Sequence, residues 1–350
     1  MFWTWVKQKL SALLAIFRFE SAGSGWKNLI VTSLLILVIL ILLLGAYWSR
    51  EPAEFSIAQN VNEKLALTGD DYVVGAASAA ALIRVAETLL DKPGGYLSND
   101  VMPPGLYLDN IPNWEFGALV QVRDFTRSFR ENFSRSQSQS TEDPDLIIAE
   151  PNFHFDNDSW LFPPSESEYR QATERLYSYL ESIADPQNVN AQFYARADNL
   201  ASWLLSVESR LGSLSQRLSA SVRQRRVNVD TSGESGAAQS TPNSAEVSVQ
   251  SPWLLVDDVF YEARGASWAL KHFLVAVEMD FEQVLEDKNA KASLRQIIRD
   301  LEASQRTVFF PIILNGSGFG IFANHSLTMA NYISRANAAI IDLRDLLSQG

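Results

Sequence analysis

The stretch LIVTSLLILVILILLLGAYW, residues 29–48, decides the architecture of this 350-residue chain. It carries no charged residue, and a helix of this length spans about 30 Å, the thickness of the hydrocarbon core of a bilayer. Trp26 precedes the stretch, and Tyr47 and Trp48 close it, as is typical of aromatic side chains at a membrane surface. The sequence therefore predicts one membrane-spanning helix from Leu29 to Trp48.

The flanking charges predict the direction of this helix. The cations Lys7, Lys9, Arg18 and Lys27 precede it against one acid, Glu20. Cationic flanks stay in the cytoplasm, so we expect residues 1–28 inside the cell and residues 51–350 outside. A cleavable signal peptide is the alternative, but both the N-terminal segment and the apolar core are long for one, and no A-x-A site follows. We expect an uncleaved signal anchor, with these residues at the membrane interface: Trp26, Lys27, Tyr47, Trp48 and Arg50.

Residues 2–19 carry a second, weaker apolar pattern. Trp3, Val6, Leu10, Leu13 and Phe17 recur at helical spacing, and lysines and an arginine are available for the polar side. This pattern fits an amphipathic helix lying on the cytoplasmic leaflet. It also fits a helix that docks on another protein, and spacing alone leaves both interpretations open.

The composition of the outer part excludes several classes of function. Residues 51–350 hold 24 of the 29 basic residues and 40 of the 41 acidic ones, a net charge of −16. Such a surface repels nucleic acid and argues against a broad patch for anionic lipid. The chain has no cysteine, which excludes disulfides and cysteine nucleophiles. Its three histidines lack metal-ligand spacing, so we expect neither a metal nor a cofactor.

The pattern outside the anchor predicts a mainly α protein: one N-terminal transmembrane helix followed by a helical-bundle extracytoplasmic domain with long ordered loops. Apolar residues recur at helical spacing over residues 72–90, 116–133, 169–183, 200–218, 253–306 and 327–347. Eight of the 13 prolines fall in residues 91–164, which predicts the loops. A strand signal stands out only over residues 307–314.

The clearest periodic segment is an apolar stripe spaced 4, 3, 4, 3 and 4 residues apart: Leu200, Leu204, Val207, Leu211, Leu214 and Leu218. Such spacing fits the core of an intramolecular helix bundle or the seam of a coiled-coil dimer. We favour the bundle, because three heptads are the minimum for a coiled coil.

Five regions follow from these patterns. They are a cytoplasmic amphipathic segment (1–28), the transmembrane helix (29–48), an extracytoplasmic helical region with Pro-rich loops (51–224), a flexible linker or loop (225–252) and a C-terminal helical region (253–350). The linker is rich in Ser, Gly, Ala, Thr and Asn, and valines are its only large apolar residues. We expect the C-terminal region to pack on residues 51–224.

Three stretches resemble a known bacterial family, domain-of-unknown-function family 2333. They are KPGGYLSNDVMPPGLYLDNIPNWEFGALVQVRD (92–124), YARADNLASWLLSVESRLGSLSQRLSAS (194–221) and FFPIILNGSGFGIFANHSLTMANYISRANAAIIDLRDLL (309–347). The resemblance implies a single-pass protein of the bacterial inner membrane in a Gram-negative cell, with its N-terminus in the cytoplasm and residues 51–350 in the periplasm. It implies no activity and no catalytic residues.

Carboxylates beside aromatic residues make residues 108–124 a candidate catalytic region. Asp109, Glu115 and Asp124 could supply the acid and base for glycan cleavage, which needs two carboxylates about 5–10 Å apart. His154 lies in a second aromatic stretch that could fold onto them. The alternative, which we favour, is that these residues make turns and caps while Trp114 fills the core or contributes to binding.

The segment NGSGFG, residues 315–320, precedes a predicted helix and is a candidate binding loop. Gly316 and Gly318 could wrap an anion at a helix N-terminus, but the Lys-Ser/Thr pair of a P-loop is missing. A tight glycine turn is the plainer interpretation. A third is an apolar loop for a partner, formed by Phe309, Phe310, Phe319 and Phe322.

The sequence favours a membrane-anchored interaction or scaffold protein of the cell envelope, more readily than an enzyme. Its expected partners are the lipid bilayer, through residues 29–48, and an envelope protein or a second copy, but no nucleic acid. The alternatives are a periplasmic hydrolase or binding protein for cell-wall glycan, and a ligand sensor that signals through a partner.

Overall fold

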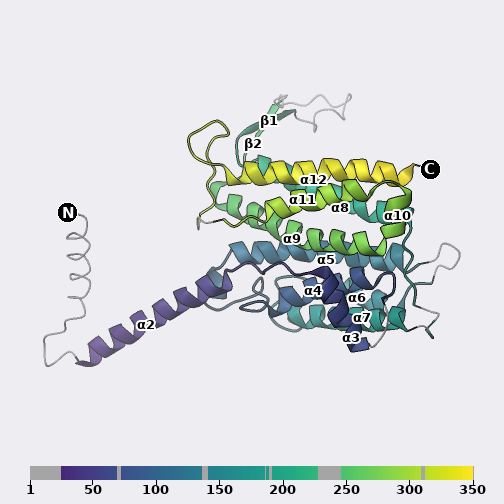
Figure 1. Ribbon diagram of the computed structural model, residues 1–350. Helices are drawn as coiled ribbons and strands as arrows, with labels where there is room; N and C mark the ends of the chain where they lie inside the picture. Colours follow the sequence, from purple (N-terminus) through teal and green to yellow (C-terminus); the bar gives the residue numbers. More distant parts are fainter. Residues whose placement is uncertain are drawn as a thin grey trace, which may run out of the picture. The chain divides into compact units, whose positions relative to one another are not determined.

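The computed structural model describes residues 25–68, 72–135, 141–185, 187–188, 191–227, 246–308 and 312–349 (Figure 1). The chain divides into two compact units, Met1–Trp48 and Ser49–Gly350. The amphipathic segment predicted at residues 2–19 lies outside the described residues.

The first unit contains α2, Gly25–Trp48. The most apolar 18-residue window within its span Trp26–Trp48 has a mean hydropathy of 3.1, and only 6% of that window is buried. The prediction of one apolar helix here is confirmed, and the helix is long and apolar enough to cross a bilayer. A signal sequence near an N-terminus passes the same test of length and composition.

The second unit is mostly helical, which confirms the mainly α prediction. Its longer helices are α3 (Ile57–Thr68), α4 (Ala76–Asp91), α5 (Asn110–Ser128), α6 (Pro144–Phe153), α7 (Ser165–Ala184), α8 (Ala197–Ser219), α9 (Val256–Asp280), α11 (Lys291–Ser304) and α12 (His325–Ser348). Shorter elements are α10 (Glu282–Asp287), two 3-10 turns (Gly105–Tyr107 and Trp253–Leu255) and a π turn (Phe129–Phe133).

The centre of the unit is the parallel pair α5 and α9, which lie side by side in Figure 1. Phe125 of α5 stacks on Phe273 of α9 with ring centroids 4.5 Å apart, and Trp114 meets Trp268 at 5.1 Å. The backbones approach closely because Gly265 faces the Trp114 carbonyl and Gly117 faces the Glu262 carbonyl. These four aromatic side chains are fully or almost fully buried, so the contact is the core of the unit.

On one side of this pair, α8 packs antiparallel against α12, and α11 packs against both α9 and α12. All six residues of the apolar stripe are buried, so the stripe is bundle core and not an exposed seam. Its main neighbour is the C-terminal helix α12, joined to it by an ion pair between Glu208 and Arg344. The N-terminal and C-terminal helical regions thus share one core.

On the other side, α4, α6 and α7 form a second layer. Asp280 at the end of α9 accepts hydrogen bonds from the backbone of Gly75 and Ser78, both at 2.7 Å, and so holds the start of α4. α6 falls in a stretch that the prolines predicted to be loop, whereas the π turn lies at the end of the helix predicted over residues 116–133. Pro144 is tolerated because it occupies the first helical turn, where Asp143 caps the helix at 3.0 Å from Asp145 N.

The predicted linker contains strand at both ends. The antiparallel strands β1 (Gln224–Val227) and β2 (Glu246–Val249) pair with Gln224 opposite Val249. Residues 228–245 between them lie outside the described residues. The predicted strand at residues 307–314 is absent from the described part of that segment, where the nearest feature is a single bridge between Asn315 and Asn324.

One end of the bundle, here called the Ser49 end, is where α5, α9 and α12 begin and where α4, α8 and α11 finish (Figure 1). Asn113 in the first turn of α5 donates to Asp258 in the first turn of α9 at 2.9 Å. The ring centroid of Phe260 lies 6.4 Å from that of His325, the first residue of α12. Two further contacts at this end join Arg217 of α8 to Glu262 of α9, and Arg264 of α9 to the Ser304 carbonyl of α11.

Candidate functional site

The carboxylates proposed for catalysis occupy separate positions. Asp109 is exposed and caps α5, accepting from Asn110 N at 2.8 Å. Asp124 makes a two-point ion pair with Arg210 of α8, at 2.7 and 3.1 Å. Glu115 and Asp124 are nine residues apart on one helix, which puts them about 13 Å apart along the axis and on opposite faces. That separation exceeds the reach of a catalytic carboxylate pair.

Glu115 is fully buried and is the hub of a polar cluster. It accepts from Leu97 N at 2.9 Å, from Ser98 N at 2.8 Å and from Ser98 Oγ at 2.6 Å, and it pairs with buried Lys92. Burial raises the pKa of Glu115, against the lowering effect of Lys92 and of these hydrogen bonds. Its contacts fasten residues 92–98 to α5.

His154 lies at the end of α6. Its Nδ1 lies 2.9 Å from the Glu150 carbonyl, and its Nε2 lies 2.7 Å from an Arg127 nitrogen. The four candidate catalytic residues are therefore held in four separate sets of contacts. None of them lines any of the four cavities described below.

The predicted binding residues divide between core and surface. Trp114 is core, packed on Trp268. Gly316 closes a tight loop by donating to the Ala323 carbonyl at 3.1 Å, and Asn324 caps α12 through Leu327 N at 2.8 Å. Phe319 and Phe322 on this loop are exposed. The loop's other predicted members, Phe309 and Phe310, lie outside the described residues.

Of the predicted membrane-interface residues, Trp26, Lys27, Tyr47 and Trp48 lie in α2 and Arg50 lies in the second unit. Trp26 and Tyr47 are exposed on the helix surface, as an interfacial aromatic requires.

Residues 51–55, here called the strap, bind along α9. Glu51 Oε1 lies 2.6 Å from Arg264 Nε, and Glu54 lies 2.7 Å from Lys271 Nζ. The Phe55 ring stacks on His272 at 4.0 Å with an interplanar angle of 7°. The signal that the sequence offered for this contact was the pair of cations, Arg264 and Lys271, in the mostly apolar segment 263–277.

His272 completes the strap through its backbone contacts. Its Nε2 accepts from Phe55 N at 3.2 Å, and its Nδ1 donates to the Trp268 carbonyl at 2.7 Å. One ring nitrogen accepts and the other donates only when the imidazole is neutral, so these two contacts require the neutral form. Burial lowers the pKa of His272 to about 4, which keeps the ring in that form.

A cavity of about 550 Å³ opens beneath the strap at the Ser49 end. Residues 49–54 form one wall, and Tyr261, Arg264 and Trp268 of α9 line the other. Arg264 also borders a smaller cavity of about 190 Å³ beside Phe260 and His325. The guanidinium of Arg264 is committed to Glu51 and to the carbonyls of Ser304 and Arg306, both at 3.0 Å, so it acts as a structural cation.

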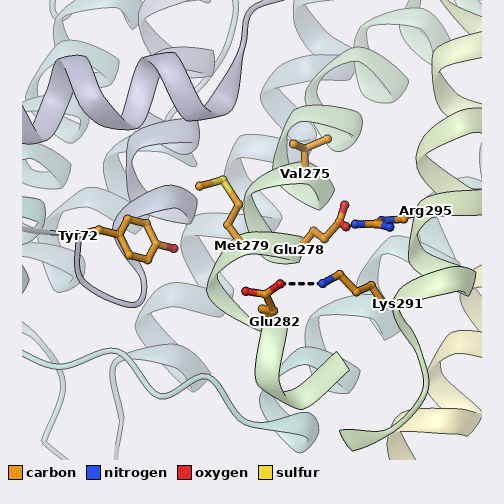
Figure 2. A pocket seen from close by; sticks show the side chains of 7 residues that line it. All are labelled: Tyr72, Val275, Glu278, Met279, Glu282, Lys291 and Arg295. Atoms are coloured by element: carbon orange, nitrogen blue, oxygen red, sulfur yellow. Dashed lines mark hydrogen bonds and ion pairs between the residues drawn. The ribbon is translucent and has the colours of Figure 1, made fainter. Parts of the chain in front are cut away.

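Two further cavities lie elsewhere. One of about 380 Å³ lies between α5, α8 and α9, and one of about 310 Å³ lies at the opposite end of α9. Figure 2 shows the second, where Lys291 pairs with Glu282 at 2.7 Å and Arg295 pairs with Glu278 at 2.5 Å. The described residues contain no group of three or more side chains placed to hold a metal ion.

The most distinctive surface is a set of four apolar loops at the Ser49 end, here called the apolar loops. They are residues 101–107, 160–162, 253–255 and 319–322. Their exposed large side chains are Val101, Met102, Leu106, Tyr107, Trp160, Leu161, Phe162, Trp253, Leu254, Leu255, Phe319, Ile321 and Phe322. We take the strap and the apolar loops together as the candidate functional site.

Comparison with known proteins gives one match. A bacterial family described as "uncharacterized protein conserved in bacteria (DUF2333)" matches residues 20–350, nearly the whole chain. No curated protein and no solved structure matches the chain.

Proposed function

The chain belongs to this bacterial family, DUF2333, and we propose that it is a membrane-anchored interaction or scaffold protein of the cell envelope. In this proposal α2 crosses the inner membrane once, and residues 51–350 form a periplasmic bundle that holds an envelope partner. The cationic N-terminal flank of α2 supports this direction, because cationic flanks stay in the cytoplasm.

The observation that carries the proposal is the strap. Trp48 ends α2, and only Ser49 and Arg50 separate it from Glu51, which is already bound to α9. A flexible tether would let the bundle swing freely, as suits an enzyme that searches for its substrate. A tether of two residues instead fixes the attachment point of the bundle, as suits a protein that holds a partner at a set place.

A glycan hydrolase is the other function to test. It requires two carboxylates within about 10 Å across a shared cleft. The contacts of Asp109, Glu115 and Asp124 give each of them a local structural role, so no observation favours this activity over the scaffold.

In-cell crosslinking of the full-length chain, followed by purification from solubilised membranes and mass spectrometry, tests the proposal. We expect a reproducible, near-stoichiometric envelope partner. A flexible Gly-Ser insertion after Trp48 should reduce its recovery, whereas Asp198→Ala, which removes an exposed ion pair with Arg196 far from the strap, should not. Recovery of the chain alone, while a control complex crosslinks efficiently, would overturn the scaffold function.

The direction of insertion has its own test, because the chain contains no cysteine. A cysteine introduced at Ser348, near the C-terminus, should react in intact cells with a thiol reagent that crosses the outer membrane only. Reaction only after the inner membrane is permeabilised would place residues 51–350 in the cytoplasm and contradict the proposed location.

A further inference from the structure

We propose that the apolar loops at the Ser49 end insert into the surface of the lipid bilayer that α2 enters, and that the lipid they contact is zwitterionic. This inference rests on the proposed function only in that α2 must be a membrane anchor. It adds a second contact with the bilayer, made by the periplasmic bundle itself.

The first argument is exposure. Ile321 is 96% exposed and Phe162 is 87% exposed, and Phe319 is fully open to its surroundings. Among the described residues of the Ser49–Gly350 unit, every large hydrophobic side chain that is more than two thirds exposed lies on one of the four apolar loops. A soluble surface does not normally concentrate its most exposed aromatic and aliphatic side chains in one place.

The second argument is position, because contacts between distant segments bring the four loops to one end. Loops 101–107 and 253–255 directly precede α5 and α9, whose first turns are joined by the hydrogen bond from Asn113 to Asp258. Loop 319–322 directly precedes α12, whose first residue lies against Phe260 of α9. Loop 160–162 follows Ser159, whose carbonyl accepts from Asn99 at 2.7 Å, in the segment that leads to α5.

The third argument is the tether. Residues 49–54 line the cavity at this same end, and Glu51 is fixed to Arg264 near the start of α9. The two residues between Trp48 and Glu51, Ser49 and Arg50, can span at most ~7 Å when fully extended. The Ser49 end therefore cannot move far from the point where the chain leaves the bilayer.

The fourth argument identifies the lipid. The loops combine aliphatic side chains with Trp160, Trp253 and Tyr107, the residue types that favour the interface between lipid and water. Carboxylates lie among them, and Asp257 and Asp109 contribute to the raised pKa of Asp258, whose first cause is burial. Acidic groups at this end oppose anionic headgroups, so apolar insertion into zwitterionic lipid is the interaction that fits.

The test uses the full-length chain, which has no native cysteine, reconstituted into phosphatidylcholine vesicles. Phe319→Cys and Phe162→Cys each place one environment-sensitive fluorophore on an apolar loop. Leu205→Cys is the matched control, since Leu205 is an exposed leucine on the side of α8. We expect lipid brominated in the upper acyl chain to quench both loop labels several-fold more strongly than the control label, and aqueous iodide to do the reverse.

The same samples are extracted with alkaline carbonate, which tests the anchor separately. Loop labels as open to iodide as the Leu205 label, in a chain that resists extraction, would overturn the insertion and leave the scaffold function standing. Loop labels shielded from iodide but untouched by brominated lipid would show that protein covers the loops, and the lipid assignment would be wrong. Release of the chain by carbonate would overturn both proposals.

Discussion

The pair formed by Lys92 and Glu115 shows what a buried charge does in this chain. Both side chains are excluded from water, and Glu115 also accepts from two backbone N–H groups of residues 97 and 98. Removing one partner of such a pair strands the other charge in a medium that solvates it poorly. This explains why a carboxylate in an aromatic segment resembles a catalytic group in sequence and serves as a fastener in the fold.

We expect Glu115→Ala to lower the free energy of unfolding by about 3–5 kcal/mol, because it leaves the buried Lys92 ammonium without its counter-ion and two N–H groups without an acceptor. Asp109→Ala, which removes an exposed helix cap, should cost about 1 kcal/mol. The double variant Lys92→Met, Glu115→Met should recover part of the loss. Thermal unfolding followed by circular dichroism measures all three, and a cost for Glu115→Ala no larger than that for Asp109→Ala would contradict the structural role.

His272 gives the strap a dependence on pH. Its pKa of about 4 lies below the ordinary value of about 6.5, so the unfolded chain binds the proton more readily. The histidine contribution to stability is therefore complete above pH 6.5 and is lost as the pH falls toward 4. Lys271 reinforces the lowered pKa, whereas Glu54 and the hydrogen bond to Trp268 oppose it.

We expect the native chain to lose about 2 kcal/mol more stability than His272→Gln between pH 7 and pH 5. Glutamine can still accept from Phe55 N and donate to the Trp268 carbonyl, so it preserves the contacts without the proton. Burial raises the pKa values of Glu115 and Asp280, which changes stability in the opposite direction, but both groups are common to the two chains and cancel in the comparison. If the stability of the two chains changed equally with pH, the low pKa would not belong to His272.

At the scale of elements, the close contact of α5 and α9 depends on glycine. A Cβ at Gly265 would overlap the Trp114 carbonyl, so the helices could not keep their spacing. We expect Gly265→Ala to cost at least about 2 kcal/mol in denaturant unfolding. Gly212→Ala on α8 is the control, because its Cβ would meet only Asn337 Nδ2 at 3.7 Å, and it should stabilise by about 0.5–1 kcal/mol. If both substitutions changed the free energy of unfolding in the same direction, this contact would not set the helix spacing.

Elements were predictable from sequence where periodicity governs them. The apolar run that forms α2 and the stripe that α8 buries against α12 follow directly from spacing. α6 was missed because Pro144 and Pro151 signal a loop, although Pro144 sits at the one helical position that tolerates it. The strap was missed because Arg264 and Lys271 meet their partners across more than 200 residues, and sequence gives no distances.

At the scale of the whole molecule, fold and function meet at the Ser49 end. The strap brings the attachment point there, and the chain reversals at that end present the apolar loops. Neither feature is visible from one segment, because each loop alone is a short apolar turn. The candidate site is therefore a property of the assembled bundle, which is why sequence reasoning placed only Phe319 and Phe322 of the loops in it.

Because the bundle is negatively charged, insertion of the apolar loops into an anionic bilayer should increase with salt concentration. Residues 51–350 carry a net charge of −16, so an anionic bilayer repels the surface that the apolar loops must bring into contact. In vesicles containing anionic lipid we expect brominated lipid to quench the Phe319→Cys label weakly at about 0.01 M salt, where charges interact over about 30 Å. Quenching should recover at about 1 M salt, where the range falls to about 3 Å. Purely zwitterionic vesicles should show little change. A basic lipid-binding patch would give the opposite trend, since salt weakens attraction, and that result would replace apolar insertion with electrostatic adhesion.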